Sequence, residues 1–72
     1  MADKTYRVTE IVGTSSEGVD DAIRGGLKRA GETLRGLDWF EVTEIRGVIE
    51  NDDIGYVQVG MKVGFRLEEP GS

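Results

Sequence analysis

The sequence IGYVQVGMKVGFRL, residues 54–67, indicates a long strand with two unlike faces. Apolar side chains alternate with polar or small ones, which is the period of a β-strand, whose successive side chains point to opposite faces. One face carries Val57, Val59, Met61, Val63, Phe65 and Leu67. The other carries Tyr56, Gln58, Gly60, Lys62, Gly64 and Arg66. We expect a strand over Ile54–Leu67 that buries only its apolar face.

The residues immediately upstream predict the hairpin partner of this strand. A second strand is expected over Trp39–Glu50, joined to the first by a turn at residues 51–53, which are of the kind that favour turns. If the hairpin is centred on Asp52, Arg46 lies directly opposite Gln58. Directly opposite residues share a face of the sheet.

The N-terminal half predicts one strand and one helix. β-Branched and aromatic residues over Lys4–Val12 favour a strand that ends at Gly13. Residues 14–17, TSSE, have the spacing of a capping box, so a helix is expected to start there, and Gly36 stands where a left-handed residue would end it. A stripe of apolar residues at spacings of three and four is expected to pack inward: Val19, Ala22, Ile23, Leu27, Ala30 and Leu34.

The helix also carries three glycines and a basic cluster. Gly25, Gly26 and Gly31 each cost roughly 1 kcal/mol relative to alanine inside a helix, which close backbone packing, for example against another subunit, would offset. The basic residues Arg24, Lys28 and Arg35 lie opposite the apolar stripe. We interpret them as a solvated face in preference to a phosphate site.

These elements predict an α+β fold of order β-α-β-β. A right-handed crossover sets the first two strands parallel, and the third strand then lies between them. The result is a three-stranded antiparallel sheet, order 1-3-2, wrapped on one helix, whose opposite face has no covering layer. Residues 1–72 form a single domain, with residues 68–72 as a flexible tail.

The composition excludes several classes of function. The chain has no cysteine and no histidine, which removes disulfides, thiolate chemistry and the usual general base near neutral pH. The net charge of −5 has the wrong sign for nucleic acid or an anionic membrane. No targeting or membrane-spanning segment is expected, so a cytoplasmic location is the default. A domain this small needs stabilisation beyond its own core, from disulfides, a structural metal or oligomerisation, and oligomerisation is the one that remains.

No catalytic residue and no metal site are predicted. Ser15 and Ser16 have no histidine to activate them, and helix capping explains their position. The acidic residues Glu50, Asp52 and Asp53 could hold a hard cation weakly, but a solvated turn is the favoured interpretation. We expect a protein that is not an enzyme.

Trp39, the only tryptophan, is the leading candidate for a ligand contact. Phe40 shares its parity with Val42 and is expected in the core, which leaves Trp39 on the uncovered face. A large ring there requires something to pack on it. A flat ligand and a subunit contact both remain open, since aromatic residues are enriched at interface cores as well as in ligand sites.

Two polar side chains would complete a site around this ring. The amide of Gln58 offers a donor and an acceptor to a planar heterocycle, and arginine is suited to bidentate capture of a phosphate. Strict alternation puts Trp39 and Arg46 on opposite faces, but the apolar pattern changes parity at residues 44–45. We therefore predict a β-bulge or sharp twist between Val42 and Arg46, which would bring the three side chains to one face. Gly60 and Gly64 give that face a low relief that another surface could approach.

Several segments of the chain resemble the bacterial dodecins: Val12-Gly13-Thr14-Ser15, Leu37-Asp38-Trp39-Phe40-Glu41-Val42, Ile45-Arg46-Gly47 and Val63-Gly64-Phe65-Arg66-Leu67-Glu68. The resemblance covers residues 6–69. It implies a small flavin-binding protein of strand, helix, strand, strand order, of which twelve copies form a hollow sphere, the homododecamer. It also implies storage and sequestration of FMN or riboflavin, not turnover.

The resemblance also implies roles for individual residues. Flavins would stack in pairs between Trp39 and its counterpart in a two-fold related subunit. Gln58 would hydrogen-bond the isoalloxazine edge, and Arg46 would reach the phosphate of FMN. Some bacterial members bind coenzyme A on their surface, which by position involves Tyr6 and Arg66.

A rival hypothesis is an interaction module that binds a protein partner on its outer sheet face, with Trp39 as the hot spot. An enzymatic interpretation would need a flavin open to substrate, and stacking on both faces of its ring argues against that. Only the dodecin hypothesis demands a closed shell.

Overall fold

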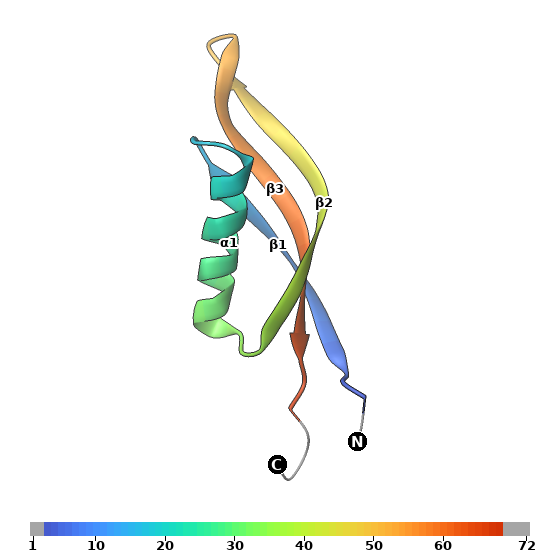
Figure 1. Cartoon of the computed structure of the whole chain (residues 1–72). Helices are drawn as coiled ribbons and strands as arrows, with labels where there is room; N and C mark the ends of the chain where they lie inside the picture. The colour runs from blue at the N-terminus through green and yellow to red at the C-terminus, as the bar shows by residue number, and fades with distance from the viewer. Residues whose placement is uncertain (1–2, 69–72) are drawn as a thin grey trace.

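The computed structural model describes residues 3–68, which form β1 (Tyr6–Ser15), α1 (Val19–Thr33), β2 (Leu37–Glu50) and β3 (Asp53–Arg66). The strands make one antiparallel sheet in the order β1-β3-β2. Figure 1 shows α1 lying along one face of the sheet, while the β2–β3 hairpin extends past the helix. The predicted β-α-β-β order and strand order 1-3-2 are both confirmed. The predicted tail falls, from residue 69 onward, outside the described residues.

β1 runs through Gly13 to Ser15, so the predicted end of the first strand at Gly13 is wrong. Gly13 pairs with Val59 inside the sheet. A Cβ at this position would overlap the backbone carbonyl of Ala22 on α1. Glycine is needed here because the helix backbone rests directly on the strand, and not because the strand stops.

The predicted capping box over residues 14–17 is not formed. α1 starts later than expected, and its N-cap residue, Gly18, makes no side-chain capping hydrogen bond. Ser15 organises the corner instead: its Oγ accepts hydrogen bonds from the backbone N–H groups of Glu17, at 2.8 Å, and Gly18, at 3.4 Å. The same hydroxyl donates to Oδ2 of Asp21 at 2.7 Å. The serine therefore joins the end of β1 to the first turn of α1.

The chain leaves α1 in an extended conformation at Leu34, whose N–H donates to the Ala30 carbonyl at 2.9 Å. Gly36 has the expected left-handed conformation, with φ of 74°, but it lies two residues beyond this C-cap, so the expectation that it ends the helix is wrong. Its carbonyl accepts a hydrogen bond from the N–H of Arg66 at 3.0 Å. The loop before β2 is thereby tied to the end of β3.

The core is small and lies between α1 and the middle of the sheet. Its fully buried residues are Ala22, Val59, Met61 and Val63. Partly buried residues pack around them: Ile11, Val19, Ile23, Leu27, Leu37 and Val57. The inward-facing stripe of the helix and the apolar face of β3 thus meet as predicted. α1 packs over β1 and β3 and makes little contact with β2.

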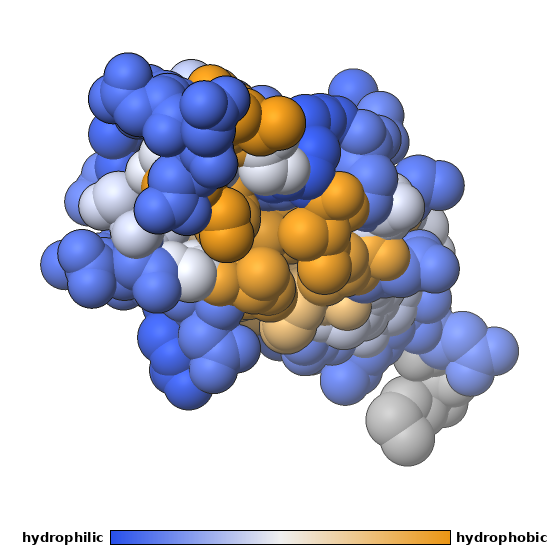
Figure 2. Space-filling model, turned by 90° about the horizontal axis from the view of Figure 1, so that it is seen from above, coloured by the Kyte–Doolittle hydropathy of each residue, from blue (hydrophilic) through white to orange (hydrophobic). Residues whose placement is uncertain are grey.

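Because α1 makes little contact with β2 beyond Leu37, the expectation that Phe40 enters the core is wrong for the single chain. Phe40 lies on the helix side of the sheet, opposite Val63, but is 44% exposed. Other exposed apolar residues continue along this side of the hairpin, and we call the set the β2 apolar strip: Phe40, Val42, Ile45, Ile49 and Ile54. Seen down the long axis of the molecule, apolar surface gathers in the middle of the view, with hydrophilic surface on both sides of it (Figure 2).

The chain is elongated, with principal extents of 55, 20 and 14 Å. Its radius of gyration is 15.1 Å, against about 11 Å for a compact domain of this length. Its accessible surface is 5650 Å², against about 4400 Å² for a compact monomer of this mass. A single copy therefore leaves an unusually large share of its surface uncovered.

Candidate functional site

A β-bulge at Thr43 determines which side chains share the outer face, the face of the sheet away from α1. The bulge shifts the pairing of β2 with β3 by one residue. On one side of it Arg46 lies opposite Gln58, and on the other Trp39 lies opposite Gly64. Six residues separate these two positions on β3, so all four residues face the same way. The predicted bulge and the predicted cross-strand pair are both confirmed.

The hairpin reaches this register differently from the prediction. The turn consists of Asn51 and Asp52 alone, whose φ values of 53° and 61° are typical of a type I′ turn. Glu50 then pairs with Asp53, which places β3 one residue earlier than expected. The extra residue Gly55 shifts the pairing again. This second bulge restores the predicted alignment at Arg46.

The indole of Trp39 lies on the outer face and packs directly over Gly64. A Cβ at position 64 would overlap Cε2, Cζ2 and Cδ2 of the ring, so the ring is in van der Waals contact with the glycine backbone. The residue remains 41% exposed. Figure 1 shows no element covering this side of the sheet. Trp39 therefore offers an aromatic surface on which a planar group could stack.

Arg46 and Gln58 form the polar part of the same face. Nη1 of Arg46 donates to Oε1 of Gln58 at 3.2 Å. Nη2 of Arg46 is hydrogen-bonded and ion-paired to Oε2 of Glu44. The Arg46 side chain stays 44% exposed, and the Gln58 carboxamide nitrogen remains as a donor. The site thus combines an aromatic surface, an amide donor and a guanidinium.

Tyr6 and Arg66 lie beside this site. They are directly opposite in the pairing of β1 with β3. The Tyr6 hydroxyl donates to Oδ2 of Asp38 at 2.6 Å, and its ring centroid lies 6.0 Å from that of Trp39. This hydrogen bond, with smaller contributions from desolvation and from the charge of Asp38, raises the pKa of the Tyr6 phenol above its ordinary value. The cation of Arg66 opposes the shift.

Sequence reasoning did not identify Asp38 and Glu44 as parts of the site, and it assigned Gly64 only a general role. Asp38 lies at a register shift between Leu37 and Trp39, which places its carboxylate within reach of Tyr6. The expected approach to Gly64 does occur, but the approaching surface is Trp39 of the same chain. The sequence predicts a bulge between Val42 and Arg46 but not its exact position. Placing it at Thr43 pairs Trp39 with Gly64 and so predicts this contact.

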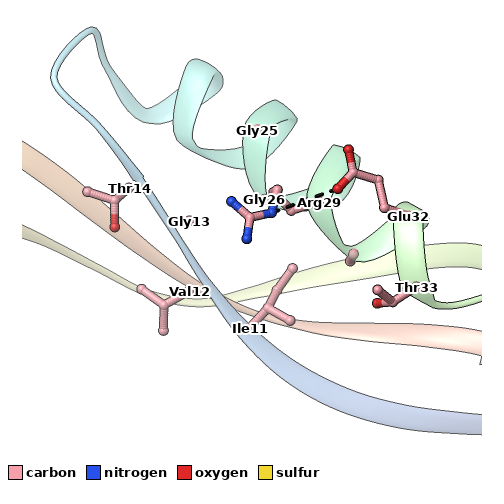
Figure 3. A pocket seen from close by; sticks show the side chains of 10 residues that line it. Ile11, Val12, Gly13, Thr14, Gly25, Gly26, Arg29, Glu32 and Thr33 are labelled. Carbon is pink, nitrogen blue, oxygen red and sulfur yellow. Dashed lines mark ion pairs between the residues drawn. The ribbon is translucent and has the colours of Figure 1, made fainter.

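A separate open groove lies on the helix side, between α1 and the edge strand β1 (Figure 3). Its floor includes Ile11 and Gly13, and the helix contributes Gly25 and Gly26. Its charged residues, Arg29 and Glu32, form an exposed ion pair at 3.9 Å. This groove has no aromatic residue and lies on the other side of the sheet from Trp39, so it forms no part of the stacking site.

Over residues 3–68, no group of three or more Asp or Glu side chains is placed to hold a metal ion. In the same range, no helix is both long and apolar enough to cross a membrane.

Comparison with known proteins assigns the chain to a family. The family model for dodecin matches residues 5–68. The chain belongs to the dodecin family. The dodecin of Thermus thermophilus is 56% identical over 66 residues, covering 92% of this chain and 96% of that protein.

Solved dodecin structures agree with the fold. Dodecin from Streptomyces davaonensis superposes with a TM-score of 0.91 at 62% identity, covering 94% of this chain and all of that one. Dodecin from Streptomyces coelicolor gives a TM-score of 0.90 at 61% identity, over 96% and 99% of the two chains. Dodecins are small binding proteins, not known enzymes, and they typically form oligomers.

Proposed function

We propose that this dodecin binds flavins, FMN or riboflavin, and stores them in a non-reactive form. The observation that carries the proposal is the outer sheet face, on which the bulge at Thr43 aligns an exposed indole with an amide and a guanidinium. An isoalloxazine ring needs a flat apolar surface together with hydrogen bonds at its edge. Trp39 supplies the surface and Gln58 the edge contact. Membership of a family known for flavin binding supports the assignment.

The polar groups also fit the two flavins differently. Arg46 is the only cation in contact with Gln58 among the described hydrogen bonds, and it is suited to the phosphate of FMN. Riboflavin has no phosphate for it to bind. Gln58 uses its Oε1 to accept from Arg46, which leaves its Nε2 to donate to a carbonyl of the ring.

We further propose that the complete site needs several copies of the chain, assembled as a hollow homododecamer. One indole covers only one face of a flavin, so a stacked pair of flavins would lie between Trp39 and the same residue of a two-fold related subunit. The exposed β2 apolar strip and the large accessible surface of the single chain support self-association. The family typically forms oligomers.

Storage accounts for the site better than turnover does. A flavin held between two aromatic rings and packed against a second flavin leaves a substrate little access to its reactive atoms. The chain has no histidine or cysteine to act as acid, base or nucleophile beside it. The protein would store its ligand in the cytoplasm, the location expected from the sequence.

Coenzyme A is proposed as a second ligand, at Tyr6 and Arg66. The exposed guanidinium of Arg66 could pair with a phosphate of the coenzyme. The hydroxyl of Tyr6 is already bonded to Asp38, so its ring is the part available for contact.

The proposal is tested by titrating FMN and riboflavin separately into the purified protein and following flavin fluorescence, with light scattering for the mass of the complex. We expect both flavins to bind with loss of emission, to a species of about twelve subunits. Arg46→Ala should lower the affinity for FMN by about 10-fold or more, because a charge-assisted hydrogen bond is worth about 1.5–3 kcal/mol. The affinity for riboflavin should fall much less. Unchanged emission from a small species would favour the interaction module instead.

A further inference from the structure

The position of the Trp39 ring depends on the absence of a side chain at Gly64. The two residues are cross-strand partners, and the indole lies against the glycine backbone, with Cε2, Cζ2 and Cδ2 of the ring nearest to it. Gly60, on the same face of β3, differs in this respect, because a Cβ there would meet the flexible side chain of Glu44 and not a ring. A side chain at position 64 would have to lift the indole away from the sheet.

Tyr6 lies beside the ring, and Asp38 holds the Tyr6 hydroxyl. Tyr6 is on β1 and Asp38 is on β2, and β3 separates these strands. Their 2.6 Å hydrogen bond therefore crosses over the middle strand. The Tyr6 ring is tilted at 56° to the indole with centroids 6.0 Å apart, within the range of a favourable aromatic pair. A hydroxyl bonded to a carboxylate makes a short, strong contact.

We propose that Gly64, Tyr6 and Asp38 form a tryptophan seat, a set of positioning residues that holds the indole flat on the outer face before any ligand arrives. The inference rests on the proposed function for its ligand. Stacking requires the ring plane to be fixed, and a ring already fixed loses less conformational entropy on binding. Gly64 supplies the floor of the seat, while Tyr6 and Asp38 close its side.

The seat makes flavin affinity depend on a glycine that touches no ligand. Alanine at position 64 must either displace the indole or push the two strands apart, and either change removes the flat surface. A loss of the Tyr6 hydroxyl removes only the side support, so the ring regains motion while its floor remains.

The test compares Gly64→Ala with Gly47→Ala, a strand glycine whose added Cβ would meet nothing closer than 3.9 Å. For each protein we would record near-ultraviolet circular dichroism without ligand, mass by light scattering and affinity for FMN and riboflavin. The chain has a single tryptophan, so a change in the indole bands reports Trp39. We expect Gly64→Ala to alter these bands and to lower the affinity for both flavins by at least 10-fold. Gly47→Ala should resemble the parent protein in its spectrum and in both affinities.

Side-support variants keep the inference testable if Gly64→Ala fails to fold. Tyr6→Phe and Asp38→Ala should each lower the affinity for both flavins by about 2- to 10-fold, the range expected when one ordered side chain becomes free to move. Asp38→Asn keeps an acceptor for the hydroxyl and should recover most of the affinity.

The outcomes separate the seat from the proposed function. Flavin binding that is equal in the parent and in all of these variants, with unchanged indole bands, would overturn the seat and leave flavin binding intact. A parent protein that binds no flavin would overturn the proposed function, while the indole bands of Gly64→Ala would still decide whether Gly64 positions Trp39.

Discussion

Arg46 is hydrogen-bonded to two partners of different charge, and these partners determine which of its N–H groups are free to bind a ligand. Gln58 is neutral and accepts through Oε1, whereas Glu44 is an anion that occupies Nη2. An incoming phosphate must displace this carboxylate or share the guanidinium with it. If FMN binds at this site as proposed, we expect the selectivity between FMN and riboflavin to depend on Glu44 as well as on Arg46.

Glu44→Gln should raise the affinity for FMN by about 1.4- to 5-fold and leave the affinity for riboflavin unchanged, because an exposed ion pair is worth about 0.2–1 kcal/mol. The control is Glu41→Gln, which removes a carboxylate opposite Lys62 on the same face without touching Arg46. The ratio of the two affinities is obtained from parallel fluorescence titrations. An unchanged ratio in Glu44→Gln would contradict competition for the guanidinium.

Tyr6 should make stability fall in alkaline solution. Its phenol has a raised pKa in the folded chain, so near an ordinary value of about 10 the folded state binds more protons than the unfolded state. The stabilisation is fully present below this pH and is lost as the pH rises through the folded-state pKa. Urea unfolding at a series of alkaline pH values should show a steeper loss for the parent than for Tyr6→Phe. Parallel curves for the two proteins would show that the Asp38 bond does not contribute.

At the scale of elements, the parts that follow a strict period were predictable and the close contacts were not. The alternation in β3 predicted its faces, and the parity change after Val42 predicted the bulge that builds the site. Gly13 was misread as a strand end because sequence alone does not show that a helix backbone rests on it. Phe40 was assigned to the core because its parity is correct, but parity cannot say how far α1 reaches across the sheet.

The two adjacent helical glycines should respond differently to alanine. A Cβ at Gly25 meets nothing within 4 Å, so Gly25→Ala should stabilise the protein by roughly 0.5–1 kcal/mol through helix propensity. A Cβ at Gly26 would lie 3.2 Å from Cε of Met61 and 3.4 Å from Cα of Gly13. Gly26→Ala should therefore be less stable than Gly25→Ala.

Thermal unfolding followed by far-ultraviolet circular dichroism measures both variants under the same conditions. The reverse order of midpoints would contradict the packing at Gly26. A loss of assembly confined to Gly25→Ala would instead place Gly25 at a subunit contact, one of the kinds of close packing that would offset a helical glycine.

Residues 3–68 form an elongated sheet with α1 on one face, and within this range no element covers the outer face or the helix side of β2. The exposed residues of the β2 apolar strip extend toward the hairpin tip, where Ile49 and Ile54 are 78% and 74% exposed. A small core and a large uncovered surface are typical of a subunit whose stability depends on its neighbours.

Ile45→Asp should therefore reduce the mass of the assembly, because it places a charge in the middle of the β2 apolar strip. Ile45→Val keeps the surface apolar and serves as the control. Multi-angle light scattering of both variants at equal concentration gives the masses. An aspartate variant that retains the full mass would show that this strip is not a subunit contact.

Fluorescence emission of FMN, titrated with the parent protein and with Trp39→Ala, is the most direct measurement of whether Trp39 forms the stacking surface. We predict that the parent quenches the emission on binding and that Trp39→Ala leaves it unchanged. An unchanged emission with the parent, or equal quenching by the two proteins, would contradict the account.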